Sequence, residues 1–434
     1  MSACIQHNQQ QPTLKTGVYK RRRPEKTAAY QAVQHHLETW LETTREANPD
    51  YEAIPHYIER DLRRFLECGI LAYGFARVYC DHCGRDYLLA YSCKGRGICP
   101  SCNTKRMVET AAHLVDQLFP LVTVRQWVIT LPKRLRYYLH QNNELSGSVL
   151  RIGLRVIQQL LRDHCPEAPP SAKYGGVTYI HRFGASLNAH IHYHSCIVDG
   201  LFAETEKGMR FYQTADLSDE VIHQAQEQIR KRILRLFVRR ELLTPEAADQ
   251  MKRWKNGGGF TLHGEVQIEA TNRTGLERLL RYCARPIFAG ERLSWKEEDE
   301  HLIYQLPKPS HDGQTQLRLT PTEFLDRIAA LIPQPRKHRH RYHGVLAPNA
   351  PLRKKVTARA GQPVNAVVEA DPVETKPVEL DESSVGALTA SIWAMLITRI
   401  YEINPLICPM CGNEMRIIAL TYRDVLMPCE AGCR

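Results

Sequence analysis

The sequence predicts an α+β fold with a central antiparallel sheet, flanking helices and small cysteine-ligated zinc-binding modules. Strand-like apolar segments interleave with amphipathic helical segments between residues 122 and 352, as in a sheet covered by helices. Ten of the fourteen cysteines fall in two clusters, at 68–102 and 408–433. Since the N-terminus does not resemble a secretory signal, clustered Cys-x-x-Cys pairs indicate zinc rather than disulfides.

Length and composition restrict the class of protein. A chain of 434 residues has room for two to four domains, and 43% hydrophobic with 24% charged residues is typical of a soluble globular protein. No apolar run is long enough to span a bilayer, so we expect a cytoplasmic protein without membrane association. The net charge of +11 favours polyanionic partners, nucleic acid before anionic membrane. No feature of the sequence indicates an oligomeric state.

The expected elements follow from periodicity and from helix-breaking residues. Apolar spacing predicts helices, with a break at Pro55, in 27–67, 107–119, 150–161 and 274–284. Strands are predicted at 126–131, 176–181, 190–198 and within 260–268. Five segments result: a basic arm with N-terminal helices (1–60), a zinc-binding domain (61–121), the α+β domain (122–352), a linker (353–386), and a C-terminal helix with a zinc knuckle (387–434). The start of the arm, up to residue 26, is interpreted as a solvated, disordered tail.

Two cysteine pairs carry the first metal prediction. Cys80 and Cys83 form one Cys-x-x-Cys pair, and Cys99 and Cys102 form another, with fifteen residues between the pairs. Zn²⁺ prefers four tetrahedral ligands, and two such pairs on facing turns supply them. We therefore expect one structural zinc here; the alternative is four unligated core cysteines. Four thiolates argue against a catalytic zinc.

Other cysteines leave the number of zinc ions open. Cys68 and Cys93 lie in the same region and are either ligands of a second site or buried apolar residues. Basic residues flank this region and suit contact with DNA: Lys94, Arg96, Lys105 and Arg106.

A third pair, Cys408 and Cys411, lies near the C-terminus. The candidate partners of this pair are Cys429 and Cys433, whose spacing is looser.

Three histidines occur at alternate positions of a predicted strand. His190, His192 and His194 would all point to one face, because side chains alternate along a strand. Imidazoles that converge from one strand suit a divalent cation such as Mg²⁺, Mn²⁺ or Zn²⁺. The alternative is a polar strand face with ordinary hydrogen-bonded histidines; three in register favour metal binding.

A tyrosine lies on the basic helix predicted at 274–284. Tyr282 flanks the apolar stripe of this helix, on the same side as Arg278 and Arg285. Guanidinium groups bind phosphodiester oxygens and favour the phenolate form of a nearby tyrosine. From this pattern alone, an amphipathic boundary tyrosine remains the favoured interpretation over a nucleophile.

The ordered series of motifs resembles the rolling-circle insertion-sequence transposases of the HUH endonuclease superfamily, with their N-terminal transposase zinc-binding domain. The similar stretches are 65–70, 92–96, 99–102, 125–128, 187–202, 282–286, 322–325, 342–348 and 393–415. The resemblance implies that the α+β domain is an HUH nuclease, with His192 and His194 as ligands of a catalytic Mg²⁺ or Mn²⁺. His190 is then an additional histidine and a candidate third ligand.

The resemblance also implies that Tyr282 is the nucleophile, assisted by Arg278 and Arg285. Many relatives carry two tyrosines four residues apart on this helix, whereas position 278 is Arg here. The chain therefore resembles the single-tyrosine branch. Relatives continue into another helical segment after residues 417–420, whereas this chain soon stops, which suggests a truncated or frameshifted end.

Together these features predict a transposase that nicks and rejoins single-stranded DNA at element ends through a 5′-phosphotyrosine. One alternative is a catalytically inactive, zinc-dependent DNA-binding regulator, which would need neither the histidine strand nor Tyr282. A second alternative is a metal hydrolase. It would need a carboxylate beside the metal to activate water, and the sequence offers no candidate.

Overall fold

The computed structural model describes residues 22–47, 54–206, 208–296, 300–310, 312–364, 406–422 and 425–428. The chain divides into two compact units: 1–31 with 63–95 and 372–434, and 32–62 with 96–371. Four predicted features lie outside the described residues: most of the basic arm, the linker from residue 365, the C-terminal helix, and Cys429 with Cys433. None of the described helices is long and apolar enough to cross a membrane.

The second unit is built on a six-stranded antiparallel sheet, in the order β13-β4-β5-β3-β8 with β9 also beside β3. Its strands are β3 (Val124–Thr130), β4 (Gly175–Phe183), β5 (Ala189–Val198), β8 (Thr261–His263), β9 (Gln267–Ile268) and β13 (His340–Gly344). The alternation along β5 sends Ile191 and Tyr193 into one core and Cys196 into the other. The predicted α+β class with an antiparallel sheet is confirmed.

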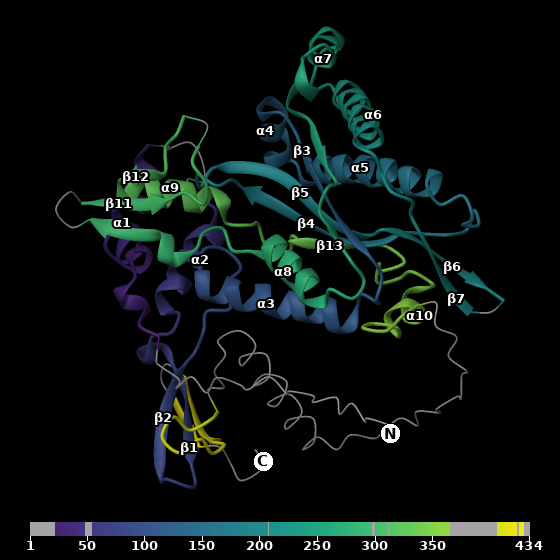
Figure 1. The fold of residues 1–434 in the computed structure, drawn as a ribbon. Coiled ribbons are helices and arrows are strands. Elements are labelled where there is room, and N and C mark those ends of the chain that lie inside the picture. Colours follow the sequence, from purple (N-terminus) through teal and green to yellow (C-terminus); the bar gives the residue numbers. More distant parts are fainter. Residues whose placement is uncertain are drawn as a thin grey trace, which may run out of the picture. The chain divides into compact units, whose positions relative to one another are not determined.

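Three helices cover one face of this sheet (Figure 1). They are α4 (Lys133–Gln141), α5 (Asn143–Asp163) and α6 (Asp219–Arg239). Asn142 ends the short link between α4 and α5 and caps α5, because its side chain accepts a hydrogen bond from the Leu145 N–H at 2.9 Å. Trp127 and Tyr193 are fully buried in the core that these helices form with the sheet.

Helices α3 (Pro100–Gln117) and α8 (Arg273–Ala284) pack on the opposite face (Figure 1). Helix α3 begins earlier than predicted, because Pro100 occupies its first turn, where no backbone N–H is required. Helix α8 matches the predicted span and ends before Pro286. The segment 353–364, which the sequence assigned to the linker, instead contains α10 (Arg353–Thr357) and buries Val356 and Val364 in this core.

Smaller elements complete the second unit. They are the hairpin β6 (Gly200–Thr205) and β7 (Gly208–Gln213), α7 (Pro245–Lys252), the sheet of β10 (Leu293–Lys296), β11 (His301–Gln305) and β12 (Gln316–Leu319), and α9 (Pro321–Leu331). Thr320 and Glu323 form a capping box that fixes the start of α9. The N-terminal helices α1 (Ala28–Glu46) and α2 (His56–Glu67) each have residues in both units, and the start of α2 agrees with the predicted break at Pro55.

The first unit contains a four-stranded antiparallel sheet in the order β15-β14-β1-β2. Its strands are β1 (Phe75–Cys80), β2 (Arg85–Ala90), β14 (Arg416–Tyr422) and β15 (Val425–Pro428). Strand β14 pairs with β1, so residues more than 300 positions apart share one small core around Val78 and Met415. The sequence did not predict this sheet, because no local signal links the two ends of the chain.

Candidate active site and metal sites

Three histidines converge on the face of the central sheet that α8 covers. His181, His192 and His194 each offer a ring nitrogen, and these nitrogens lie within 4.8 Å of one another. All three side chains are buried. The predicted pair His192 and His194 is therefore brought together, but the third member of the group is His181 rather than His190.

The register of β4 against β5 explains this correction. His181 lies directly opposite His192 in the antiparallel pair, so both side chains emerge on the same face. The register shifts between His181 and Phe183, beside the start of β5. His190 lies at this irregular end, and it is not part of the cluster, although its ring centroid is 4.9 Å from that of His192.

Hydrogen bonds fix the tautomers of two of these histidines. The Nδ1–H of His192 donates to the carbonyl of His190 at 3.0 Å, and the Nε2–H of His181 donates to the carbonyl of Cys283 at 2.6 Å. A carbonyl only accepts, so the opposite ring nitrogen of each histidine carries a lone pair. The buried Nδ1 of His181 has no hydrogen-bond partner, as expected of a nitrogen available to a cation.

Gln126 makes the polar contact to the ring of His194. Its side-chain amide lies 2.9 Å from the Nδ1 of His194, whose buried Nε2 has no hydrogen-bond partner. The same amide lies 3.3 Å from the Sγ of Cys283. The amide nitrogen faces Nδ1 and donates to it; the amide turned over would accept the Nδ1–H through its oxygen and leave Nε2 free for a metal, the arrangement usual in metal sites.

Burial keeps these imidazoles neutral, which is the form that binds metals. It lowers the pKa of His192 to about 4, and together with the neighbouring His192 and Arg285 it lowers the pKa of His194 to about 3. The pKa of His181 falls well below its usual value, first from burial and then from the other two histidines. Three neutral imidazoles, two of them with a free lone pair, fit a divalent cation.

The candidate nucleophile Tyr282 lies at the edge of this cluster. Its ring centroid is 5.6 Å from that of His194, in an edge-to-face arrangement. Tyr282 is 51% exposed, whereas its neighbour Cys283 is buried. Helix α8 therefore buries its apolar stripe under the sheet and leaves the phenol accessible beside the histidines.

The two predicted arginines occupy different surroundings. The guanidinium of Arg285 lies over the Tyr282 ring, 4.4 Å from its centroid. Arg278 is exposed one turn earlier on α8, and no hydrogen bond or ring contact joins it to Tyr282 among the described residues. Arg281, between them, pairs with Glu277 at 2.6 Å.

Four cysteines from distant parts of the sequence form a cluster within the first unit. They are Cys80, Cys83, Cys408 and Cys411. The two Cys-x-x-Cys turns have the same geometry, because the N–H of Gly84 donates to the Cys80 carbonyl and the N–H of Gly412 to the Cys408 carbonyl. Both glycines have a positive φ, of 66° and 73° respectively.

The donors of this cluster fit a structural zinc. The Sγ atoms of Cys80 and Cys411 are 3.4 Å apart, and those of Cys83 and Cys408 are 3.5 Å apart. Although burial raises it, backbone N–H donors of Met410 and Cys411 bring the pKa of Cys408 down to about 6. Such a thiol is readily deprotonated, as a zinc ligand must be.

A second group of four buried cysteines consists of Cys68, Cys93, Cys99 and Cys102. The sequence had combined Cys80 and Cys83 with Cys99 and Cys102 in one site, and this pairing is wrong. Cys80 and Cys83 instead cluster with Cys408 and Cys411. Cys99 and Cys102 cluster with Cys68 and Cys93. The partners Cys429 and Cys433 proposed for the C-terminal pair lie outside the described residues.

Two protein-family models match parts of the chain. Residues 175–354, which include His181, His192, His194 and Tyr282, match the family described as "Putative transposase". Residues 32–131 match the family described as "Transposase zinc-binding domain". These two stretches are similar to a transposase domain and to a transposase zinc-binding domain, respectively. No curated protein and no solved structure was found to match it.

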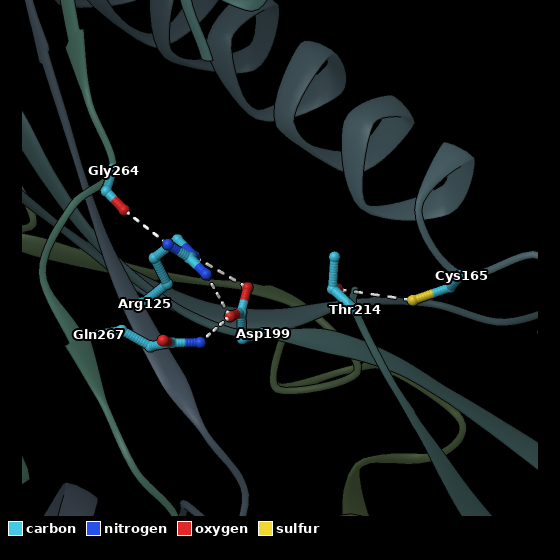
Figure 2. Close-up of polar contacts among 6 residues, drawn as sticks. All are labelled: Arg125, Cys165, Asp199, Thr214, Gly264 and Gln267. Carbon is cyan, nitrogen blue, oxygen red and sulfur yellow. Dashed lines mark hydrogen bonds and ion pairs between the residues drawn. The ribbon is translucent and has the colours of Figure 1, made fainter. Parts of the chain in front are cut away.

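A buried ion pair links strands of the central sheet (Figure 2). Arg125 binds both carboxylate oxygens of Asp199, at 3.0 and 2.7 Å, and donates to the Gly264 carbonyl at 2.9 Å. Gln267 donates to the same carboxylate at 2.6 Å. The network thus joins β3, the end of β5 and the β8–β9 segment. Arg125 directly precedes Gln126 on β3. The network fixes the strand that carries the partner of His194.

The sequence analysis missed two residues of the transposase domain's site. His181 ended a predicted strand, and its position opposite His192 follows from the short hairpin between the strands, a signal that was present but unused. Gln126 lies in the stretch 125–128, one of those that carry the family resemblance. Its side chain reaches His194 because β3 pairs with β5. This contact had no local signal.

Proposed function

We propose that the transposase domain nicks and rejoins single-stranded DNA through a covalent link to Tyr282, with a divalent cation held by His181, His192 and His194. The observation that carries this proposal is the exposed Tyr282 ring beside a buried cluster of three metal-competent histidines. Metal-assisted transesterification needs at least a nucleophile and a metal site that can contact the same phosphodiester group.

The reaction forms one bond and breaks another. The Tyr282 hydroxyl oxygen attacks the phosphorus and loses its proton to solvent, while the bond from phosphorus to the 3′ oxygen breaks and this oxygen takes up a proton. The products are a 5′-phosphotyrosine and a free 3′-OH. Because the phosphodiester energy is kept in the covalent link, attack by another 3′-OH reverses the step and joins strands without a nucleotide cofactor.

The side chains around Tyr282 position the nucleophile and the phosphate. Arg285 lies over the phenol ring and can donate to the phosphate oxygens as charge develops on them. Arg278, exposed on the same helix, is placed to bind a neighbouring part of the DNA backbone. A cation in the histidine site supplies Lewis-acid polarisation of the scissile phosphate.

The donor set also bears on the identity of the cation. Imidazole nitrogens suit transition metals, whereas Mg²⁺ prefers oxygen ligands. Among the described residues, no carboxylate belongs to the histidine cluster. Of the two cations that the sequence suggested, Mn²⁺ therefore fits these three histidines better than Mg²⁺.

The cysteine clusters and the basic charge serve DNA binding in this proposal. Each of the two cysteine clusters would bind a structural zinc ion. The net charge of +11 would give an affinity for DNA that falls steeply as the salt concentration rises. A transposase acts on DNA, and we infer that the zinc-binding domain positions the element end.

The test uses purified protein, Mn²⁺ or Mg²⁺, and end-labelled single-stranded DNA tiled across both flanks of the encoding gene. Wild-type protein should form an adduct that survives denaturation, and Tyr282→Phe should abolish it. Tyr137→Phe is the matched control, because Tyr137 is similarly exposed, at 67%, and lies on α4 across the sheet.

Two results would contradict the proposal. Cleavage without an adduct, retained in Tyr282→Phe, would indicate a metal hydrolase. DNA binding without cleavage under either cation, on every flanking sequence, would indicate a DNA-binding regulator.

A further inference from the structure

A cavity of about 250 Å³ adjoins the histidine cluster in the second unit. It lies between the end of β4, helix α3, the end of α8 and the segment 331–340. His181 and Cys283 line it and also belong to the active site, where the His181 Nε2–H donates to the Cys283 carbonyl. A ligand in this cavity would therefore lie next to the residue that follows Tyr282.

The lining of the cavity is strongly basic. Five permanently cationic side chains reach it: Arg96, Arg106, Arg182, Lys337 and Arg339. No aspartate or glutamate is among the lining residues. Such a concentration of one charge sign in a hollow attracts anions more strongly than the same charges spread over a surface.

Arg339 has only neutral groups as hydrogen-bond acceptors among the described residues. Its guanidinium donates to neutral acceptors: the Asn103 side chain, the Arg96 carbonyl at 3.4 Å and the Arg285 carbonyl at 3.5 Å. Burial, and then the charges of Arg106 and Arg96, lower the pKa of Arg339 to about 10. Asp61 acts in the opposite direction on Arg96, whose pKa is nevertheless lowered by burial and by Arg106. A bound anion would relieve this repulsion.

Apolar and aromatic groups form the rest of the wall, including Tyr179, Phe183, Ile287 and Leu331. A phosphate ion alone would gain nothing from them, whereas a nucleotide has an aromatic base as well as a phosphate. The volume is below the roughly 300–1,000 Å³ of pockets for drug-sized ligands, so it suits one nucleotide rather than several.

We propose that this cavity holds one nucleotide of the single-stranded DNA next to the scissile phosphate, with its base against Phe183 and Ile287 and its phosphate on Lys337 and Arg339. The inference rests on the proposed function and extends it, since it assigns a position to the substrate strand. An extruded base held in this way would set the register of the strand relative to Tyr282.

The phosphate contact is tested by fluorescence anisotropy with a labelled single-stranded oligonucleotide, without added Mg²⁺ or Mn²⁺. Lys337→Glu should weaken binding by about tenfold and reduce the slope of log affinity against log salt by about 0.7, one phosphate contact. Lys231→Glu makes the same charge change on an exposed residue of α6, across the sheet, and should have a much smaller effect.

The base contact is tested with 2-aminopurine placed at successive positions of the oligonucleotide. Wild-type protein should change the fluorescence strongly at one position. Thr110→Phe, which adds a ring on the α3 wall of the cavity, should abolish this signal. Thr104→Phe adds the same ring on α3 outside the cavity lining and should retain it.

The cavity inference fails if both glutamate variants bind alike and no position gives a signal that Thr110→Phe removes. Failure of the proposed function looks different. In that case no Tyr282 adduct forms, although the cavity variants still lose binding. Conversely, adduct formation together with cavity variants that bind like wild type would overturn only the cavity inference.

Discussion

The guanidinium carbon of Arg285 lies 4.4 Å from the ring centroid of Tyr282 and 5.6 Å from that of Phe183. Phe183 in turn stacks on His181, with centroids 5.0 Å apart and an interplanar angle of 18°. One arginine therefore connects the candidate nucleophile to the histidine cluster through a continuous series of ring contacts. Arg285 is also the C-cap residue of α8, the helix that carries Tyr282.

Replacement of Arg285 should impair the chemical step more than DNA binding. We expect Arg285→Ala to slow adduct formation in single-turnover assays by about 10²-fold, because it removes a donor to the developing phosphate charge. Arg285→Lys should recover part of the rate, since it keeps the charge but loses the planar fork. Arg281→Ala is the control on the same helix, because Arg281 pairs with Glu277. Equal losses in both alanine variants would refute this role.

The third metal ligand can be identified by a paired substitution. His181→Ala should lower the affinity for Mn²⁺, followed by electron paramagnetic resonance, by more than the roughly 10–100-fold typical of residues that only orient ligands. His190→Ala should cost less than about tenfold, because His192 uses the backbone carbonyl of His190, which the variant retains. The opposite order would restore His190 as the third ligand.

Gln126 should act on the metal through His194. Gln126→Ala should lower the Mn²⁺ affinity by about 10–100-fold, because His194 loses the amide that orients its ring. Gln126→Glu should match or exceed the wild-type affinity, since a carboxylate can accept a proton from Nδ1 and leave Nε2 of His194 free for the metal. Gln305→Ala, at an exposed position of β11, serves as the control. If Gln126→Glu were as defective as Gln126→Ala, the amide would contribute packing rather than a hydrogen bond.

Local patterns predicted the parts of this site that lie on one element. The alternation of His192 and His194 along a strand, and the position of Tyr282 beside an apolar helical stripe, are properties of single elements. The contribution of His181 depends on the register between two strands, which a hairpin fixes but periodicity alone does not. The role of Tyr282 was not evident from its helix; it required the family resemblance, and the ring of His194 is what gives it a structural basis.

The grouping of the cysteines could not be predicted from the sequence. A Cys-x-x-Cys pair fixes half of a tetrahedral site, and the nearest second pair in the sequence is the natural partner. Here Cys83 meets Cys408, 325 positions away, because β14 pairs with β1. Spacing cannot reveal such a partner, since it arises from tertiary strand pairing.

Zinc content measured on double variants distinguishes the two groupings of cysteines. The clusters predict two zinc ions per chain. Cys80→Ser combined with Cys408→Ser should remove one ion, because both belong to one site. Cys80→Ser combined with Cys99→Ser should remove both ions. Cys165→Ala, at a buried cysteine outside the clusters, should remove none. Loss of a single ion from the Cys80/Cys99 variant would support the pairing inferred from sequence spacing.

The buried pair of Arg125 and Asp199 should dominate the stability of the sheet around the site. The side chains are 8% and 1% exposed, so Asp199→Asn leaves a buried guanidinium without its counter-charge. We expect a loss of about 3–5 kcal/mol in the free energy of unfolding, measured with urea. The exposed pair of Arg240 and Glu144, 2.8 Å apart, is the control, and Glu144→Gln should cost less than about 1 kcal/mol.

Because Arg125 adjoins Gln126, folded Asp199→Asn protein should also bind Mn²⁺ more weakly than Glu144→Gln protein. Unchanged stability and unchanged Mn²⁺ affinity would show that the pair neither stabilises the fold nor positions β3.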